Sequence, residues 1–213
     1  MISVNDMKNL IVPDQFGGDE DDYENASFNR IIDQIGEDIQ YAYGASKFVI
    51  FPEEEDIVIK LPLNGEFHWN SDDDDYTEFT YLRNTNYCED EEQIYFMAKK
   101  AGIEFFFAAT ECGGFTKNGV PFYVSTRILT EIAADVVVPS ENSKSLAKKY
   151  RKEYSYCLPY HWLAEAIEYY GNNKVLQLIN FVDKYKINDI HTGNVGYRAD
   201  GAPCIFDYSG YYS

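Results

Sequence analysis

The apolar residues change their spacing near Ser140, and this change restricts the fold more than any other feature of the sequence. Before it, apolar residues stand in short runs bounded by turn residues, which is typical of β-strands. After it, they recur at helical spacing in three segments, residues 141–153, 159–170 and 173–185. Strands followed by a block of helices indicate an α+β fold, with an antiparallel sheet in the first half.

The first half is predicted to begin with a helix and a strand hairpin. A helix that follows Ser27 places its isoleucines on one face. Residues 47–51 and 56–61 are two apolar runs joined by a tight connection, which predicts a hairpin. The acidic segment 64–86 is interpreted as an inserted loop that carries a short helix near residues 76–82.

A second helix and a second pair of strands follow. The helix is expected over about residues 89–101, ending at Gly102, with Ile94, Met97, Ala98 and Ala101 directed inward. Strands are predicted at residues 105–110 and 121–128, on either side of the turn at Asn118-Gly119. Two short strands, residues 195–197 and 203–206, come last.

These elements predict three parts of the chain. Residues 1–25 are polar and acidic and are expected to form a flexible leader. Residues 26–128 form a lobe with a sheet and one long helix, interrupted by the acidic loop 64–86. Residues 129–213 form a small helical lobe that ends in a strand pair.

The formal charge of −18 is concentrated near the start. Residues 1–92 hold 24 Asp and Glu against 5 Lys and Arg, a net charge of −19, whereas residues 93–213 hold 12 against 13, a net charge of +1. The acidic residues lie in the runs 19–22, 53–56, 72–75 and 89–92. We interpret these runs as solvated loops or helix starts or, alternatively, as an acidic face for a basic protein partner. The sign is wrong for nucleic-acid phosphates, so no direct nucleic-acid binding is expected.

The composition also indicates where the protein works. No apolar run approaches the ~20 residues of a membrane helix, and the first residues lack the pattern of a secretion signal. The four cysteines (Cys88, Cys112, Cys157 and Cys204) are far apart in the sequence. This spacing does not favour a disulfide framework or a metal cage, and we expect a cytoplasmic protein without membrane contact.

Three polar residues near the end carry the most specific chemical pattern. Asp189 is followed five positions later by Asn194, and Asp207 stands at the end of a short apolar run. Enzymes that transfer phosphoryl groups use an Asp to orient the attacking hydroxyl, and an Asn and a second Asp to hold magnesium. The spacing therefore predicts a phosphoryl-transfer site; its plain alternative is a polar loop beside a hairpin.

Two charged residues of the first half extend this pattern. Lys60 ends the apolar run Ile57-Val58-Ile59, the setting of a lysine that contacts the phosphates of a nucleotide. An acid on the following helix must hold such a lysine in place. Glu91 lies on the inward face by its spacing to Ile94 and Ala98, and Glu92 is one step round the helix. We prefer Glu91 as the partner of Lys60 and keep Glu92 as the alternative.

Together these residues resemble the protein-kinase-like superfamily over residues 44–210. The catalytic loop is similar to that of aminoglycoside and other small-molecule phosphotransferases, since His191 stands where protein kinases carry Lys. The chain also resembles short kinase-like proteins of bacteriophages and prophages, which would place it in the cytoplasm of a host cell. The resemblance implies a two-lobed fold, ATP and Mg²⁺ as cofactors, and an unidentified small-molecule or protein acceptor.

The same resemblance implies a role for each residue. Asp189 would act as base, Asn194 and Asp207 as magnesium ligands, Lys60 as phosphate contact and Glu91 as its partner. His191 would also contact the nucleotide. Gly44 and Ser46 would lie where a glycine-rich loop covers the phosphates.

Several departures leave other functions open. The segment Gly44-Ala45-Ser46 replaces a Gly-x-Gly-x-x-Gly loop, and Asp207 is followed by Tyr-Ser-Gly instead of Phe-Gly. The sequence ends six residues after Asp207, so we expect little platform for a peptide substrate. A kinase-shaped binding protein (a pseudokinase) that engages a basic partner through the acidic first half is the main alternative. Nucleotidyl transfer on the same fold, and an acidic inhibitor or immunity-type protein in which the motif is accidental, also stay open.

Overall fold

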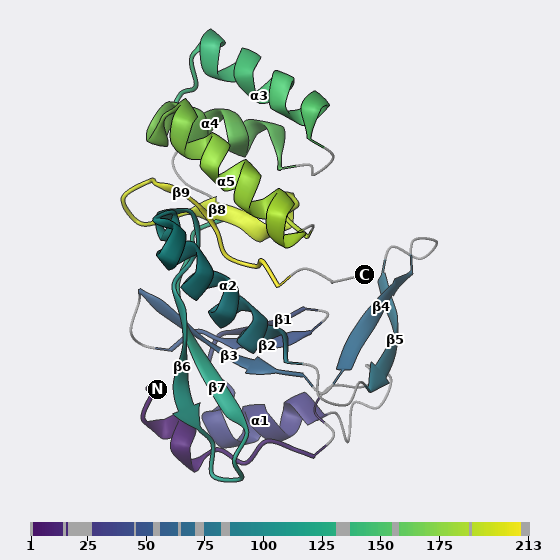
Figure 1. The fold of residues 1–213 in the computed structure, drawn as a ribbon. Coiled ribbons are helices and arrows are strands. Elements are labelled where there is room, and N and C mark those ends of the chain that lie inside the picture. Colours follow the sequence, from purple (N-terminus) through teal and green to yellow (C-terminus); the bar gives the residue numbers. More distant parts are fainter. Residues whose placement is uncertain are drawn as a thin grey trace. The chain divides into compact units, whose positions relative to one another are not determined.

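The structure is a computed structural model that describes residues 2–14, 16, 27–44, 46–52, 56–63, 65–70, 75–81, 86–130, 137–154, 158–187 and 189–209, with the backbone alone for 65–70 and 75–81. These residues form an α+β structure with an antiparallel sheet, as the sequence predicts (Figure 1). The chain divides into two compact units. The first contains Met1–Glu92 and Thr110–Thr126, and the second Gln93–Ala109 and Arg127–Ser213.

The first unit is built on a sheet of five strands. These are β1 (Tyr41–Tyr43), β2 (Lys47–Ile50), β3 (Ile57–Pro62), β6 (Thr110–Phe115) and β7 (Pro121–Thr126). Their order in the sheet is β1-β2-β3-β7-β6, and every neighbouring pair is antiparallel. The predicted hairpin of residues 47–51 and 56–61 is confirmed by the pairing of β2 with β3.

The first residues of the chain belong to the core of this unit. Ile2, Met7, Leu10, Val12 and Phe16 are buried together with Ile31 and Ile35 of helix α1 (Ser27–Ile35), and Met7 lies in the short 3₁₀ helix η1 (Asp6–Asn9). The prediction of a flexible leader is therefore wrong for residues 2–14 and 16. Its apolar residues were too widely spaced to show a helix or strand period, and they are buried one by one. The whole acidic run 19–22 and most of the runs 53–56 and 72–75 lie outside the described residues.

The inserted segment forms a second, separate hairpin. Its strands are β4 (Gly65–Asn70) and β5 (Asp75–Tyr81), and Phe67 pairs with Phe79 in the register. The prediction of a short helix near residues 76–82 is wrong. The segment Asp75–Tyr81 is rich in tyrosine, threonine and phenylalanine, which favour the extended backbone once a partner strand lies beside them.

Helix α2 (Tyr87–Ala101) begins two residues earlier than predicted and ends at Gly102, whose φ of +69° suits glycine. Ile94 and Ala98 are buried, as predicted, but Ala101 is exposed. The predicted strand 105–110 is also wrong. Glu104–Phe106 forms the 3₁₀ helix η2, and β6 starts only at Thr110. Phe106 and Phe107 are buried in the core of the second unit, so their burial comes from helix packing and not from the sheet.

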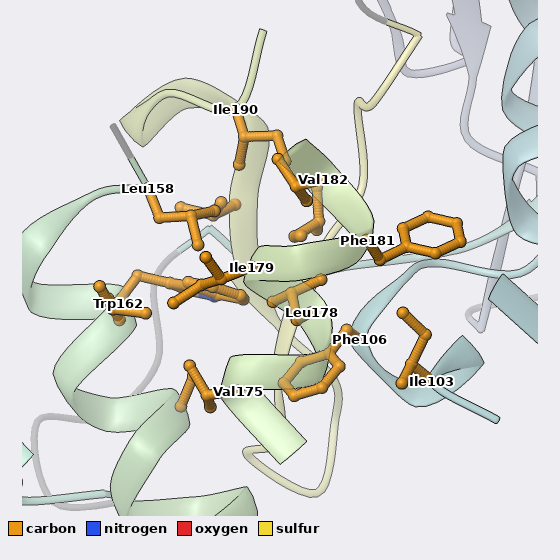
Figure 2. Close-up of a cluster of buried hydrophobic side chains, with 14 of the residues drawn as sticks. Ile103, Phe106, Leu158, Trp162, Val175, Leu178, Ile179, Phe181, Val182 and Ile190 are labelled. Carbon is orange, nitrogen blue, oxygen red and sulfur yellow. The ribbon is translucent and has the colours of Figure 1, made fainter. Parts of the chain in front are cut away.

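The second unit packs three helices around an apolar core. They are α3 (Glu141–Glu153), α4 (Tyr160–Tyr170) and α5 (Asn172–Tyr185), which agree with the predicted segments to within one residue. Trp162, Leu178 and Phe181 are among the side chains that fill the space between helices and η2 (Figure 2). A short hairpin completes the unit, with β8 (Val195–Tyr197) antiparallel to β9 (Pro203–Ile205).

Helix α4 holds this hairpin in place. The indole of Trp162 donates a hydrogen bond to the carbonyl of Gly196 at 3.3 Å, and the Tyr197 hydroxyl donates to Glu165. The β8–β9 hairpin, which lies between Asn194 and Asp207 in the sequence, is thus fixed to the helical core. None of the helices formed by the described residues is long and apolar enough to cross a membrane.

Candidate functional site

A buried cluster of charges lies in the first unit. The Nζ atom of Lys60 on β3 lies 2.6 Å from Oε2 of Glu91 on α2, as the sequence predicts for this pair. The Nζ atom of Lys47 on β2 lies 2.8 Å from the other carboxylate oxygen, Oε1. Glu91 is fully buried, and the two lysines are 4% and 5% exposed. One carboxylate therefore joins two strands of the sheet to the helix.

Helical spacing explains why Glu91 takes this position and Glu92 does not. Glu91 precedes Ile94 and Ala98 by three and seven residues, so all three face the interior. Glu92 is rotated away by one residue and accepts the backbone N–H of Cys112 on β6 at 2.7 Å. The alternative partner for Lys60 thus has a separate, structural contact.

Most residues of the acidic run 89–92 therefore make contacts inside the protein or are partly buried. Glu91 and Glu92 make the contacts described above, and Asp90 is half-buried. Burial raises the pKa of Asp90, and the nearby charge of Glu89 raises it further. The run lies at the start of α2, one of the settings expected for such runs, but only Glu89 among its four residues is exposed.

The second unit contains the loop that carries Asp189. Ile187 and Ile190 are buried on either side of it, and Figure 2 shows Ile190 directed into the helical core. Asp189 lies between these two buried residues, and its side chain is 35% exposed. The side-chain nitrogen of Asn194 donates to the backbone carbonyl of Asp189 at 2.7 Å and lies 3.5 Å from its Oδ2. Asp189 and Asn194 are thus brought together through the side-chain nitrogen of Asn194.

His191 caps the single turn η3 (Thr192–Asn194) that follows. Its Nδ1 accepts the backbone N–H of Gly193 at 3.0 Å, so in the neutral ring the proton is on Nε2. This Nε2 lies 3.8 Å from Oδ1 of Asp189. A Cβ at Gly193 would lie 2.9 Å from the imidazole, so a larger residue here would shift the exposed His191 ring. His191 is exposed and adjoins the candidate base.

The strand pair β8–β9 brings Asp207 to the end of the hairpin where Asn194 lies. The backbone N–H of Phe206 donates to the carbonyl of Asn194 at 3.0 Å, and Asp207 is the next residue. Tyr208 then anchors the segment. It is fully buried, donates its hydroxyl to the carbonyl of Ala108 at 2.7 Å and packs edge-on against Phe107. Asp207 itself is half-buried.

Gly44 and Ser46 lie in the connection between β1 and β2. The N–H of Gly44 donates to the carbonyl of Lys47 at 3.0 Å, and the carbonyl of Ser46 accepts from Leu63 at 3.0 Å. Both groups therefore belong to the sheet hydrogen bonds. The expected use of the Gly44 N–H for phosphate is not supported, although a Cβ at Gly44 would meet no atom within 4 Å and the position is open.

A magnesium ion is implied by the sequence pattern, and the residues fit one. Among the described residues, no three His, Cys, Asp or Glu side chains gather into a metal site. Magnesium, however, is commonly held by one or two carboxylates plus phosphate oxygens and water. Asn194 and Asp207 offer an amide and a carboxylate. Ser209, two residues on, is 3% exposed, and its Oγ has no hydrogen-bond partner within the part of the chain described. A hydrated ion satisfies such a hydroxyl.

The Cys204 side chain, next to this segment, belongs to the core. It is fully buried, and burial raises the pKa of its thiol to about 11. Sequence reasoning missed Lys47, because only the strand register shows that it shares a sheet face with Lys60. The predicted hairpin could have identified Lys47, because Lys47 lies on one of its strands and Lys60 on the other.

The structure thus forms two groups of the predicted residues, one in each unit. Lys60 and Glu91 meet in the first, and Asp189 and Asn194 meet in the second, beside the segment that carries Asp207. Comparison of the chain with protein-family models, with curated proteins and with solved structures gave no match.

Proposed function

We propose that the protein is an ATP- and Mg²⁺-dependent phosphotransferase with a protein-kinase-like, two-lobed fold and an unidentified acceptor. The observation that carries this proposal is the buried ion pair of Lys60 and Glu91 at 2.6 Å. A lysine on the third strand, held by a glutamate on the helix that follows, is the pair that protein kinases need for activity. A structural ion pair alone would gain little, because desolvation of two charges offsets much of their attraction.

The residues of each unit would act as follows. Glu91 orients Lys60, which contacts the phosphates of the nucleotide and positions them for transfer. Asp189 orients the acceptor hydroxyl and takes up its proton. His191 holds Gly193 through its Nδ1 and directs its Nε2–H towards Asp189. It would help to position Asp189 or the transferred phosphate.

Asn194 and Asp207 would hold magnesium. When bound, the ion would supply positive charge that neutralises the phosphates. Asn194 is preset for this role because its amide donates to Asp189 and its backbone carbonyl accepts from Phe206. Tyr208 fixes the backbone that carries Asp207, and the preceding residue, Phe206, bonds the carbonyl of Asn194.

A titration of ATP with and without Mg²⁺, followed by thermal unfolding, tests the proposal. ATP at about 100 times its dissociation constant stabilises a protein by about 2.7 kcal/mol, a shift of about 5–10 °C at this size. The variants are Asp207→Asn and, as the matched control, Asp200→Asn in the exposed turn of the same hairpin. We expect the shift in the wild type and the control but not in Asp207→Asn. No shift in the wild type, or an equal shift in all three, contradicts the proposal.

The Gly44 N–H already donates to a carbonyl of the sheet. This observation favours a second candidate function, a pseudokinase-type binding protein with a basic partner. Fewer backbone donors for phosphate predict weak turnover, even where the nucleotide binds. A measurement of ADP formed from ATP, with and without candidate acceptors, separates the two functions. A partner held by surface charge should dissociate as salt is raised from about 0.05 to 0.5 M.

A further inference from the structure

We propose that helix α3 and the pocket beside it form a docking site for an acidic peptide segment that carries one large apolar side chain. The site combines an apolar pocket with exposed positive charges on the same helix. None of its residues belongs to the Lys60–Glu91 pair or to the segment 189–207. The inference therefore does not depend on the proposed function.

The pocket lies between the three helices of the second unit. Its lining includes Tyr150, Arg151 and Tyr154 of α3, Leu163 of α4, and Ile179 and Val182 of α5, the last two labelled in Figure 2. The hydroxyl of Tyr150 donates to Oδ1 of Asn172 at 2.5 Å, so the polar end of this side chain already has a partner. The pocket therefore offers mainly apolar surface, with Arg151 as its charged member.

The size of the pocket indicates what it can hold. It contains about 280 Å³ of empty space, part of which is open to solvent. Pockets for small molecules usually measure ~300–1,000 Å³ and bury most of the ligand. A smaller, open pocket suits one anchoring side chain of a longer chain, such as leucine or phenylalanine, which gains free energy by leaving water.

Helix α3 supplies the positive charge of the site. It carries five Lys and Arg against two Glu, in a chain whose net charge is −18. The two glutamates pair with Lys144 and Lys149. Lys148, Arg151 and Lys152 are exposed, and none of these three has an acidic partner within the described part of the chain. They are available to a partner from outside.

The three cations are neighbours on the helix surface. Lys148 stands three residues before Arg151 and four before Lys152, and like charges at these spacings destabilise a helix. Arg151 and Lys152 lie in the last turn, where the helix dipole favours cations, but Lys148 lies outside it. Carboxylates of a partner would remove the repulsion. The pocket favours a peptide over a nucleic acid, because a peptide can insert an apolar side chain beside its carboxylates.

Fluorescence anisotropy with labelled heptapeptides at about 0.05 M salt tests the site. Each peptide has three glutamates on either side of a central leucine, phenylalanine or, as the matched control, alanine. We expect the leucine or the phenylalanine peptide to bind about tenfold or more tightly than the alanine peptide. Arg151→Glu should weaken this binding about tenfold. Lys99→Glu, the same change of charge at an exposed lysine of α2 in the same unit, should not.

Tyr154→Ala tests the apolar part of the site separately. It should reduce the preference for leucine over alanine, whereas Arg151→Glu should weaken both peptides. Thermal unfolding without peptide shows whether each variant is folded. The inference is overturned by no saturable binding of either apolar-centred peptide up to about 1 mM, by equal affinity for the alanine peptide, by equal binding to Arg151→Glu and wild type, or by tighter binding of labelled oligothymidylate.

Discussion

Asn194 and Asp189 are joined by a hydrogen bond of 2.7 Å from the side-chain amide to the backbone carbonyl, across five residues. Because the carbonyl of Asn194 also accepts the N–H of Phe206, one asparagine ties the loop of Asp189 to the end of the β8–β9 hairpin. Its structural task and its proposed metal-binding task therefore use different atoms of the same residue.

Replacement of Asn194 by alanine should remove both the hydrogen bond to Asp189 and the proposed metal ligand. Loss of the amide donor removes a part-buried hydrogen bond to the Asp189 carbonyl and is expected to cost about 1 kcal/mol of unfolding free energy. The magnesium-dependent effect of ATP should be lost as well. Asn118→Ala is the matched control, since Asn118 bonds both backbone groups of Val12 in the first unit. It should lower stability and keep the ATP effect; if Asn194→Ala behaves in the same way, Asn194 is structural only.

Removal of the Glu91 charge should destabilise the fold strongly. In Glu91→Gln two buried lysines lose their carboxylate, and a broken buried ion pair costs about 3–5 kcal/mol. Glu92→Gln changes a neighbouring residue that accepts one N–H, with an expected loss of about 1 kcal/mol. Urea unfolding of both variants gives the comparison. Similar losses in the two would mean that the charge cluster is better solvated than its burial indicates.

The sequence predicted the parts of this molecule that depend on local spacing. The three helices of the second unit, the pairing of β2 with β3 and the choice of Glu91 over Glu92 all follow from periodicity. Lys47 was missed because its role depends on the register between two strands. The burial of Ile2 and Phe16 and the pairing of β4 with β5 depend on partners that are distant or have no regular period, so no local pattern could show them.

A side chain at position 196 should not be tolerated. A Cβ on Gly196 would lie 2.4 Å from the backbone oxygen of Leu129, which pairs with Tyr197 in an isolated bridge. Because backbone cannot yield as a side chain can, Gly196→Ala is expected to cost about 1–3 kcal/mol. Gly44→Ala, with no atom within 4 Å of its Cβ, should leave thermal stability nearly unchanged. A stable Gly196→Ala protein would show that the bridge to Leu129 opens at little cost.

Glu168 should make stability depend on acid pH. The backbone N–H and hydroxyl of Ser140, which caps α3, and the hydroxyl of Ser143 donate to its carboxylate and lower its pKa from 4.5 to about 2. Because the folded-state pKa is lowered, this contribution is complete above about pH 4.5 and is lost as the pH falls towards 2. Unfolding curves of the wild type and Glu168→Gln should therefore differ at pH 6 and converge near pH 2.

The donors allow an independent check of this pH dependence. Ser140→Ala removes one of the hydroxyls that lower the pKa of Glu168, so the acid sensitivity assigned to Glu168 should shrink in this variant. A difference between wild type and Glu168→Gln that stays constant from pH 6 to pH 2 would show that the serines stabilise neutral and charged forms alike.

The hydrogen bonds between Val12 and Asn118 have a consequence for synthesis in the cell. They join residues 106 positions apart, and Phe122 and Phe16 share a buried cluster. At about 5–20 residues per second, a ribosome needs about 5–20 s to make the intervening chain. For that time Met7, Leu10 and Phe16 have no completed core to enter. The nascent chain therefore presents an apolar N-terminal segment that chaperones can bind before the sheet closes.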